Sequence, residues 1–453
     1  MRVLLVSSYE LGHQPLHVAS PAAALRAAGH EVRCLDLSVE AWDPGLVCWA
    51  EGVGFSVPMH TAMRLAMRAA TAARELRPQL PVCFYGLYAP VSRDLTVGRL
   101  ADLVVAGEYE PALLRWAGSL DARERPRSEA AVQLDRYVFD LPARDLLPSL
   151  EHYAHLALNG EERLVGYVEA SHGCVHRCRH CPVPAVYDGR IRIVGGDVVV
   201  ADIAQLVELG ARHITFGDPD FLNGRGHSLA VAEAMHARFP ELTFDCTTKV
   251  EHVLEHADVW GPLRAAGCLF VVCALESVDD ETLARLDKGH TTYEASEAIA
   301  LLRAHGIEVR PSFMPFTPWT EPADVLDILD FVVAHDMIEN VDPIQYAIRL
   351  LLPEGSLLLE HPDMAEHLGP YDAEALTYLW TPADPRSDEL QRRLAAIVER
   401  AGAQGEAVPA TFERVRAAVL EYVPERELAL AGAGQIERGS VEGRPRLTEP
   451  WFC

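Results

Sequence analysis

Short apolar runs alternate with longer amphipathic stretches along most of this chain, a pattern typical of strands separated by helices. In the first 120 residues the strand-like runs are residues 2–8, 32–38, 46–52, 80–86 and 102–110. Helices are expected between them, including one that Ser20 would open with Pro21 at its first position. Strands that alternate with helices predict a parallel sheet covered on both faces. We therefore expect an α/β, Rossmann-like domain over residues 1–120.

The same alternation returns in a second region. Residues 121–163 form a connector rich in charge and proline. Beyond it the strand-like runs are residues 165–171, 213–218, 242–248, 268–277, 307–316 and 341–350. Six consecutive strand–helix units predict a partial (β/α)6 barrel over residues 164–360. Residues 361–453 are expected to form a helical C-terminal region that ends in an extended tail.

Composition narrows the class of protein. Apolar residues make up 49% of the chain, which excludes a disordered protein, and the net charge of −26 does not favour nucleic acid or an anionic membrane as partner. The apolar runs are too short to span a bilayer. Ten cysteines in 453 residues do not suggest a disulfide framework, so we expect a soluble, cytoplasmic protein.

The most informative stretch is "ASHGCVHRCRHCPVP", which places Cys174, Cys178 and Cys181 in a C-x3-C-x2-C spacing. Three thiolates on one loop can hold three irons of a [4Fe–4S] cluster and leave the fourth iron open to a small ligand. The loop follows a predicted strand, and parallel barrels carry their chemistry on such loops. An iron–sulfur cluster is therefore the favoured interpretation.

Zinc is the alternative for the same loop. His172, His176 or His180 would complete a Cys3His set, and the protein would then be a non-catalytic zinc-binding protein. Structural zinc sites usually combine two separated ligand pairs, and no second pair occurs at such a spacing here. The downstream Cys246, Cys268 and Cys273 lie in strand-like runs, where buried thiols are expected.

The cysteine motif and the strands after it resemble the radical S-adenosylmethionine (SAM) superfamily. The further segments that carry the resemblance are "HITFGDPDFLN", "CLFVVCALESVDDETLARLDKGHT", "VRPSFMPFTPWTEPAD" and "IQYAIRLLLPEGSLL". The resemblance implies that the three cysteines hold a [4Fe–4S] cluster whose open iron binds SAM. It also implies a set of SAM-contacting residues: His180, Gly217, Asp218, Glu276, Ser277 and Ser312. Asp218 as a turn residue and Glu276 as a helix cap stay open as alternatives.

The N-terminal domain resembles the cobalamin-binding domain that precedes many radical SAM barrels. The resemblance rests on "DLVVAGEYEPALL" and on Arg144–Asp145 in the connector. The D-x-H-x-x-G motif, whose histidine ligates cobalt, is absent, so cobalamin is possible but not favoured. A radical methylthiotransferase with a second cluster at Cys34, Cys48 and Cys83 is a further alternative. We expect these three to be buried thiols instead.

Lysine is almost absent: only Lys249 and Lys288 occur among 40 basic residues. Where lysine is so rare, an ammonium group at a given place is of interest in its own right. Chance retention of these two lysines explains the pattern equally well. We expect Lys249 to steer substrate or the SAM carboxylate, and Lys288 to have a surface or structural role.

The tail "RPRLTEPWFC" resembles the end of a radical SAM group that closes with Cys-Cys-Ala-Glu-Pro or Cys-selenocysteine-Ala-Glu-Pro. This resemblance predicts that translation continues past Cys453 through a recoded UGA codon and that Cys453 has a redox role. An ordinary terminus with a free thiol is the alternative, and the codons after position 453 decide between them.

The resemblance as a whole implies an enzyme that cleaves SAM reductively and forms a 5′-deoxyadenosyl radical to modify an unknown small-molecule or peptide substrate. A cobalamin-dependent radical SAM methyltransferase is the alternative within the same class. Either would draw its electron from a donor such as flavodoxin or ferredoxin.

Overall fold

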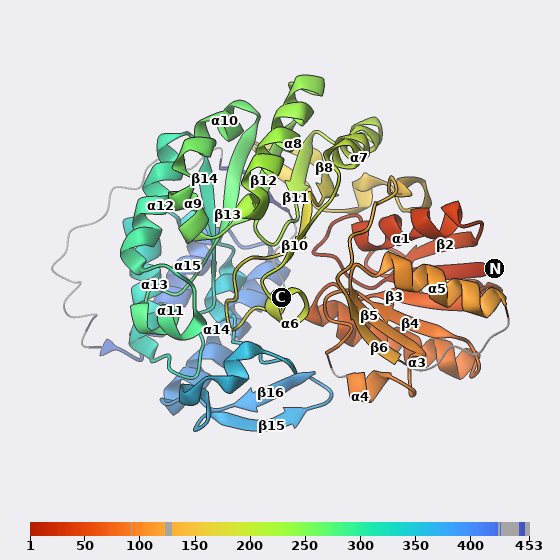
Figure 1. The fold of residues 1–453 in the computed structure, drawn as a ribbon. Helices are drawn as coiled ribbons and strands as arrows, with labels where there is room; N and C mark the ends of the chain where they lie inside the picture. The colour runs from red at the N-terminus through yellow and green to blue at the C-terminus, as the bar shows by residue number, and fades with distance from the viewer. Residues whose placement is uncertain (92, 123–128, 425, 427–443, 449–453) are drawn as a thin grey trace.

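The structure is a computed structural model that describes residues 1–91, 93–122, 129–424, 426 and 444–448. Two α/β units lie side by side, the N-terminal one in red and orange and the second in green and cyan (Figure 1). Within the described residues, none of the helices combines the length and the apolar composition needed to cross a bilayer.

The first unit is a six-stranded parallel sheet in the order β2-β1-β3-β4-β5-β6. Its strands are β1 (Arg2–Ser7), β2 (Glu31–Asp36), β3 (Gly52–Ser56), β4 (Val82–Tyr85), β5 (Leu103–Gly107) and β6 (Glu129–Gln133). Its helices are α1 (Leu16–Ala27), α2 (Pro44–Trp49), α3 (His60–Leu76), α4 (Arg93–Thr96) and α5 (Glu110–Asp121). The sheet buries one core with α1 and α5 and another with α2 and α3, because its strands are apolar on both faces.

The second unit is a half-open barrel built on a seven-stranded sheet in the order β14-β13-β12-β11-β8-β7-β17. The five parallel strands are β8 (Glu161–Val168), β11 (His213–Phe216), β12 (Thr243–Thr248), β13 (Cys268–Glu276) and β14 (Glu308–Phe313). Two antiparallel strands, β7 (His155–Leu158) and β17 (Arg446–Leu447), extend its edge.

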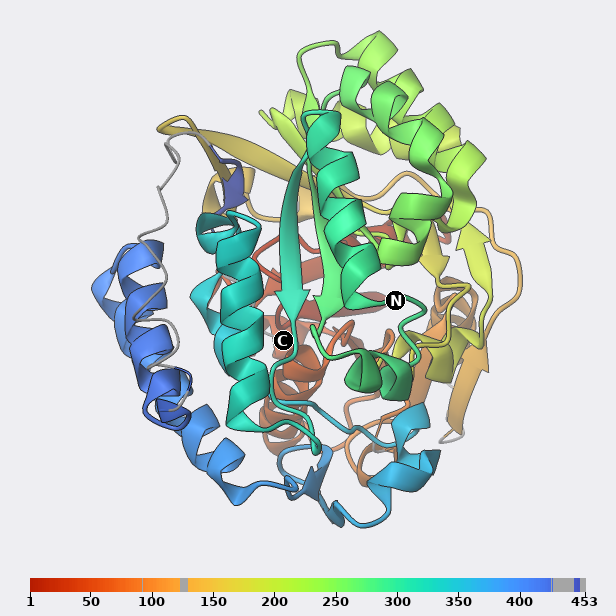
Figure 2. The ribbon, with the colours of Figure 1, turned by 90° about the vertical axis from the view of Figure 1, so that its left-hand side faces the viewer.

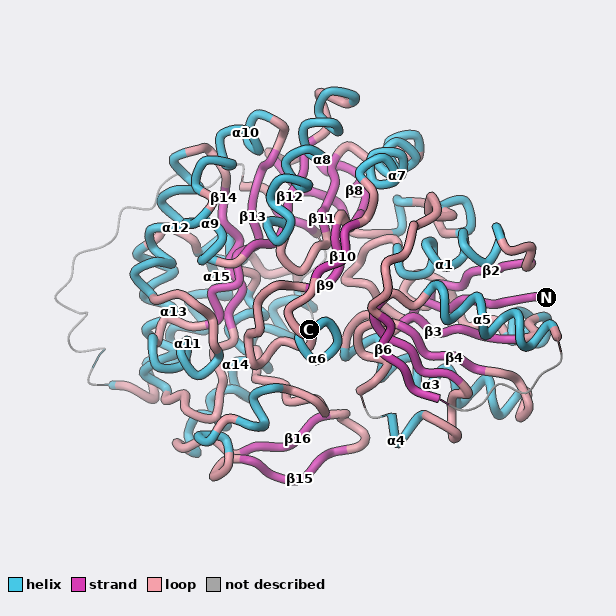
Figure 3. Tube along the Cα trace, viewed as in Figure 1, coloured by secondary structure: helices cyan, strands magenta, loops and turns pink. Residues whose placement is uncertain are grey.

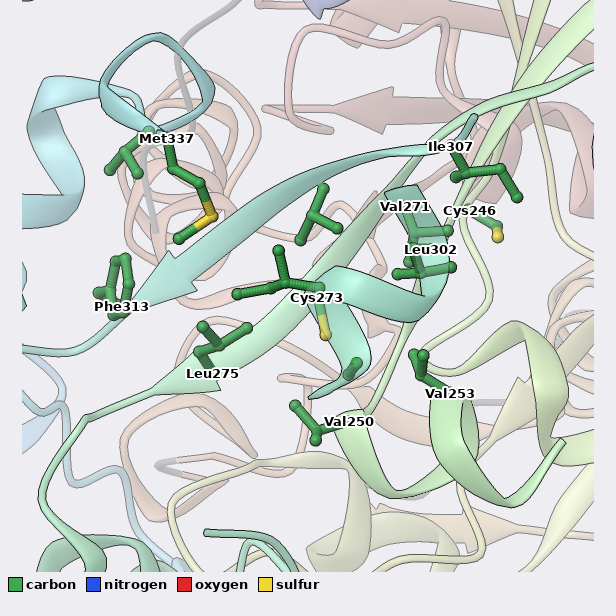
Figure 4. Close-up of a cluster of buried hydrophobic side chains, with 14 of the residues drawn as sticks. Cys246, Val250, Val253, Val271, Cys273, Leu275, Leu302, Ile307, Phe313 and Met337 are labelled. Carbon is green, nitrogen blue, oxygen red and sulfur yellow. The ribbon is translucent and has the colours of Figure 1, made fainter. Parts of the chain in front are cut away.

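Helices cover the outer side of this sheet (Figure 3). They are α7 (Gly196–Glu208), α8 (Arg225–Arg238), α9 (Val250–Glu255), α10 (Trp260–Ala265), α11 (Asp280–Leu286), α12 (Thr292–Ala304) and α13 (Pro322–Ala334). Figure 4 shows Cys246 and Cys273 among the aliphatic side chains between strands and helices. Both thiols and Cys268 are buried, which confirms that these three belong to the core.

The C-terminal region packs on the barrel. Helices α14 (Pro385–Gln404) and α15 (Val408–Leu420) lie beside α13, in blue next to cyan in Figure 2. A hairpin of β15 (Leu368–Asp372) and β16 (Thr377–Trp380) precedes them.

The α/β class and the order of two parallel sheets followed by helices are confirmed, but several boundaries differ. Residues 46–49 are helical, because Asp43 caps α2 and Pro44 occupies its first turn. Helix α1 begins at Leu16 and contains Pro21, so Ser20 does not open it. The sixth barrel strand is reduced to a 3-10 turn over Pro343–Ala347 and one bridge between Phe316 and Arg349.

The connector contributes to both sheets. Residues 129–133 form β6 of the first sheet, and residues 155–158 form β7 of the second. Between them, the short 3-10 helices Arg144–Leu146 and Leu150–His152 pass along the junction of the two units.

Candidate functional site

The carboxyl-terminal ends of the two parallel sheets meet at a cavity of about 180 Å³. The first unit lines it with residues that follow its strands: Pro58, Met59, Leu87, Gly107 and Tyr109. The barrel lines it from the segment before the cysteine loop and from the end of β11, with Glu169, His172, Gly173 and Gly217 among others. Ligands bind at this edge of parallel α/β sheets, so the cavity is the natural place for substrate and cofactors.

The three motif cysteines lie on one loop at the side of this cavity. The loop follows the short strand β9 (Ser171–Gly173), which pairs with β10 (Ile191–Ile193), and leads into α6 (Val183–Tyr187). Cys174 and Cys178 are 9% and 7% exposed, and all three thiols are free. The Cys181 amide donates a hydrogen bond to the Cys178 carbonyl (3.2 Å), so the loop turns between these two cysteines.

Neighbouring elements hold the loop in place. The Asn223 side chain accepts a hydrogen bond from the Val175 amide (3.2 Å) and donates one to the Gly173 carbonyl (3.3 Å). On the other side, the Arg179 amide donates to the Leu286 carbonyl at the end of α11 (2.9 Å). The loop is therefore fixed on one side to the 3-10 turn Phe221–Gly224 and on the other to the end of α11.

The geometry favours a cluster over a single zinc ion. A tetrahedral zinc ion needs four ligands, and none of the groups of described residues that lie close enough together to hold one ion combines these thiols with a histidine. The imidazoles that zinc would need are also engaged elsewhere, His172 with Glu108 and His180 with Glu276. Three thiols spread around one loop fit a larger, multinuclear centre.

Burial sets the protonation of these thiols before metal enters. It raises the pKa of Cys174 to about 11 and that of Cys181 to about 12. Because thiolates are the form that binds iron, assembly of a cluster must release these protons.

Gly217 and Asp218 lie directly behind the loop, at the end of β11. The Asp218 carboxylate accepts hydrogen bonds from the Ser171 hydroxyl (2.6 Å) and from the Ala170 amide (2.9 Å). Burial raises the pKa of Asp218 to about 7. Both carboxylate oxygens thus support the segment that leads to the cysteines, while Gly217 lines the cavity.

Glu276 ends β13 in a left-handed backbone conformation (φ +66°), which non-glycine residues adopt at a cost. Its carboxylate lies 3.4 Å from the Lys288 ammonium and 3.5 Å from His180 Nε2. Burial opposes ionisation of Glu276, yet the Lys288 charge and the His180 hydrogen bond lower its pKa to about 2. Helix α11 is capped by Asp279, so Glu276 is not the cap. Lys288 is buried, so of the expected surface or structural role the surface one does not apply.

The two expected serines differ from the rest of the set. The Ser277 hydroxyl accepts a hydrogen bond from the Asp279 amide (3.1 Å) and shapes the turn into α11. Ser312 lines a separate small cavity with Arg310 and Gln345. The structure therefore gives His180, Gly217, Asp218 and Glu276 contacts with the cysteine loop, its neighbours or the cavity, whereas the two serines have other partners. Cys453 lies outside the described residues.

The sequence analysis missed a chain of buried and half-buried ionisable groups that crosses the junction between the two units. His17 of α1 lies 3.2 Å from Glu169, which lies 3.2 Å from His172, which in turn lies 3.1 Å from Glu108 at the end of β5. Burial alone would lower the pKa of His17, but the Glu169 and Glu10 carboxylates raise it to about 9. Of these, Glu169 and His172 lie just before the cysteine motif in sequence, but only the fold shows which residues they contact.

A second polar group joins His176 of the loop to α9. His176 Nε2 lies 3.1 Å from His252 Nε2, and His252 Nδ1 lies 3.0 Å from the Asp220 carboxylate. Asp220 also accepts hydrogen bonds from the Leu222 amide (3.0 Å) and the Lys249 amide (3.2 Å). Its oxygens are thus already satisfied by the protein, which favours a hydrogen-bonded support of the loop over a further metal site.

The cysteines expected to be buried in the first unit are not alike. Cys83 is buried and Cys34 partly so, whereas Cys48 on α2 is exposed. The expectation of three buried thiols is therefore wrong for Cys48, because α2 replaces the strand that would have covered it.

Each of the two units matches a known protein family. The Radical SAM superfamily matches residues 168–332, and the B12 binding domain matches residues 2–116. The hopanoid C-3 methylase of Methylococcus capsulatus is 25% identical over 70% of this chain and 64% of its own length. The anaerobic magnesium-protoporphyrin IX monomethyl ester cyclase of Synechocystis is 24% identical over 73% of this chain and 69% of its own length. The chain thus spans somewhat less than two thirds of the first of these relatives.

Solved structures share the fold. OxsB, a cobalamin-dependent SAM radical enzyme with aqua-cobalamin and SAM bound, superposes with a TM-score of 0.70 at 14% identity, over 95% of this chain and 72% of its own. The radical SAM methyltransferase TsrM from Kitasatospora setae superposes with a TM-score of 0.63 at 17% identity, over 94% of this chain and 99% of its own. These likenesses confirm the fold. The sequence analysis did not favour cobalamin as a cofactor, and the match to the B12 binding domain weighs against that expectation.

Proposed function

The chain is a radical SAM enzyme that carries a B12-binding domain, and from this premise we propose that it is a cobalamin-dependent methyltransferase. The single observation that carries the proposal is the cavity between the two sheet edges, to which both units contribute. A cofactor on the first sheet would there face SAM on the barrel. The comparisons support this alternative better than radical chemistry without cobalamin.

On the barrel side, Cys174, Cys178 and Cys181 would hold the [4Fe–4S] cluster. Bound there, the cluster and SAM would supply a 5′-deoxyadenosyl radical on one-electron reduction by a donor such as flavodoxin or ferredoxin. Gly217, Asp218 and Glu276 lie close enough to this loop to shape the SAM site. Ser277 and Ser312 have weaker support because their surroundings are separate.

On the opposite side, Met59, Leu87, Gly107 and Tyr109 would form the floor on which cobalamin rests. Bound there, cobalamin would supply the methyl group. His17 lines the cavity, but its two ring nitrogens face the Tyr109 hydroxyl (2.8 Å) and Glu169 (3.2 Å). We therefore expect cobalamin to bind without coordination by His17.

The substrate would have an apolar part. A second cavity of about 210 Å³ is likewise lined by Leu87, and it is bounded by Pro90, Val91, Pro182, Ala185 and Val186 among others. Most of this lining is apolar, although Arg93 and Glu354 also contribute, so it favours a substrate with an aliphatic or ring-shaped part.

The test is anaerobic reconstitution with iron, sulfide and hydroxocobalamin, followed by reduction in the presence of SAM. A methyltransferase of this kind binds cobalamin in proportion to protein and forms both 5′-deoxyadenosine and S-adenosylhomocysteine. Cys178→Ala should abolish 5′-deoxyadenosine and leave cobalamin bound.

A matched pair of variants addresses the cavity. Leu87→Trp fills it from the first unit and should lower bound cobalamin at least tenfold with iron content unchanged. Leu76→Trp places the same side chain at an exposed position of α3 and should bind cobalamin normally. If wild type takes up no cobalamin but forms 5′-deoxyadenosine, the methyltransferase proposal is wrong. Zinc uptake without SAM cleavage would also rule out the cluster.

A further inference from the structure

Both lysines of this lysine-poor chain are buried at the mouth of the barrel. Lys249 follows β12, Lys288 follows α11, and each forms an ion pair with a different carboxylate, Glu251 and Glu276. Burying an ammonium group is costly unless its charge is used. The two sites therefore differ from the solvent-exposed arginines that carry most of the positive charge.

The backbone places Lys288 against the cysteine loop. Asp287 takes a left-handed conformation (φ +57°) that ends α11, and the Lys288 amide then donates to the Leu283 carbonyl (3.0 Å). Two residues before Lys288, the Leu286 carbonyl accepts a hydrogen bond from the Arg179 amide of the loop. The Arg179 guanidinium also donates to the Arg285 carbonyl (2.8 Å). The turn that carries Lys288 and the loop that carries the cysteines are thus one hydrogen-bonded assembly.

The charge of Lys288 acts on the thiols of that loop. Its ammonium group, 3% exposed, interacts electrostatically with Glu276 first and then with Cys178, Cys181 and Cys273. Burial would lower the pKa of Lys288, but the Glu276 carboxylate raises it, so the group stays charged. The nearby His290 is held neutral, because burial and the Lys288 charge lower its pKa to about 4. Lys249 is not among the principal charges that act on Cys174 or Cys181.

We propose that Lys288 is a positioning residue that raises the reduction potential of a cluster held by Cys174, Cys178 and Cys181. Reduction adds one electron, and hence one negative charge, to a centre that already bears thiolate ligands. A fixed cation in a low-dielectric surrounding stabilises the reduced state more than the oxidised state. The electron comes from the external donor, and no proton moves. The inference rests on the cluster of the proposed function but on neither cobalamin nor the methyl acceptor.

The experiment is a redox titration of the reconstituted cluster, followed by electron paramagnetic resonance, in the absence of SAM and cobalamin. Iron and sulfide content are measured first, so that failure to form a cluster is separated from a changed potential. In Lys288→Met the ratio of reduced to oxidised cluster at a fixed potential should fall at least tenfold, a shift of 59 mV for one electron. Lys288→Arg keeps the charge and should restore most of the wild-type ratio.

Two further variants test whether the shift in reduction potential has the expected sign and whether it is specific to Lys288. Glu276→Gln removes the counter-charge and should shift the ratio toward the reduced cluster. Lys249→Met removes the other buried lysine and should change the ratio less than threefold.

Adding Lys288→Met to Glu276→Gln should again lower the ratio at least tenfold, because the effect then cannot come from an unpaired Glu276. The proposal is overturned if Lys288→Met leaves the potential unchanged, or if Lys249→Met shifts it equally. A lower affinity for SAM with no change of potential would assign Lys288 to the SAM carboxylate instead.

Discussion

Gly217 lies where the end of β11 approaches the ring of Tyr167. A Cβ atom at this position would lie 1.9 Å from the Tyr167 hydroxyl oxygen, so even alanine cannot fit without moving the ring. Gly217→Ala should cost on the order of 1–3 kcal/mol of stability and should impair SAM cleavage strongly. Thermal unfolding and the 5′-deoxyadenosine assay measure the two effects. Gly226→Ala is the control: its Cβ would meet open space, and both quantities should stay near wild type.

Asn223 supports the cysteine loop by both accepting and donating hydrogen bonds. Asn223→Asp keeps the acceptor for the Val175 amide but loses the donor to the Gly173 carbonyl, and it adds negative charge 3.7 Å from Cys174 Sγ. We expect a cluster that assembles but is lost several-fold faster in air, as followed by its visible absorbance. Loss at the wild-type rate would show that the loop holds its shape without Asn223.

At the scale of residues, spacing in the sequence was enough to predict that the three cysteines share one loop, and their role as cluster ligands stays a prediction. Asn223, Glu169 and Lys288 could not be ranked in the same way. Each depends on a contact with a segment remote in sequence, such as the 3.4 Å approach of Lys288 to Glu276. Ser312 stays a prediction: it lies on the expected strand, but in the structure it lines a separate small cavity.

Among the structural elements, the short 3-10 helix that begins at Arg144 links the first unit to both a helix and a strand of the barrel. The Arg144 guanidinium forms two hydrogen bonds with Asp202 of α7 (3.0 and 2.8 Å) and one with the Tyr167 carbonyl of β8 (2.7 Å), and it also reaches Gln14 of the first unit. The two charged side chains are 1% and 5% exposed. Arg144→Met should therefore destabilise the protein by about 3–5 kcal/mol, because it leaves a buried carboxylate unpaired.

Chemical unfolding measures this effect, with Arg26→Met as the control. Arg26 pairs with Asp145 in an exposed ion pair, which contributes at most about 1 kcal/mol. Combining Arg144→Met with Asp202→Leu should cost less than Arg144→Met alone, since no charge is left buried. If the double variant were the less stable, the pairing would not explain the loss.

Helices and strands could be predicted where a run of apolar residues was long. The prediction failed where a helix cap, a proline or pairing with another strand decided the outcome. Residues 46–49 are apolar enough for a strand, but the Asp43 cap and Pro44 initiate a helix. In the sixth barrel segment, Pro343 sits in a 3-10 turn where a strand was expected. Strand β6 lies in a charged connector, and only pairing with β5 makes it a strand.

On the scale of the whole molecule, ionisable groups from both units share the junction. His17 of α1 faces Glu169 and His172 from the barrel, Tyr109 just before α5, and Glu10 from the loop that precedes α1. The pKa of His17 is raised to about 9 from 6.5, so its contribution to stability is complete below pH 6.5 and is lost as the pH rises toward 9. Burial raises the pKa of Glu10 to about 7, which gives the same sign between pH 4.5 and 7. Stability should therefore fall as the pH rises from neutral to 9.

If His17 is the source of this pH dependence, replacing it must reduce the slope of stability against pH and not merely lower the stability at every pH. His17→Gln should unfold at a lower temperature at pH 6.5 but lose little more at pH 9, where wild type loses on the order of 1–3 kcal/mol. His152→Gln, at an exposed position of the connector, should keep the full wild-type slope. A steep slope in His17→Gln would place the titrating group elsewhere. A flat one would mean that α1 and the barrel are held together partly by charge, so that high pH loosens the same junction at which the cavity lies.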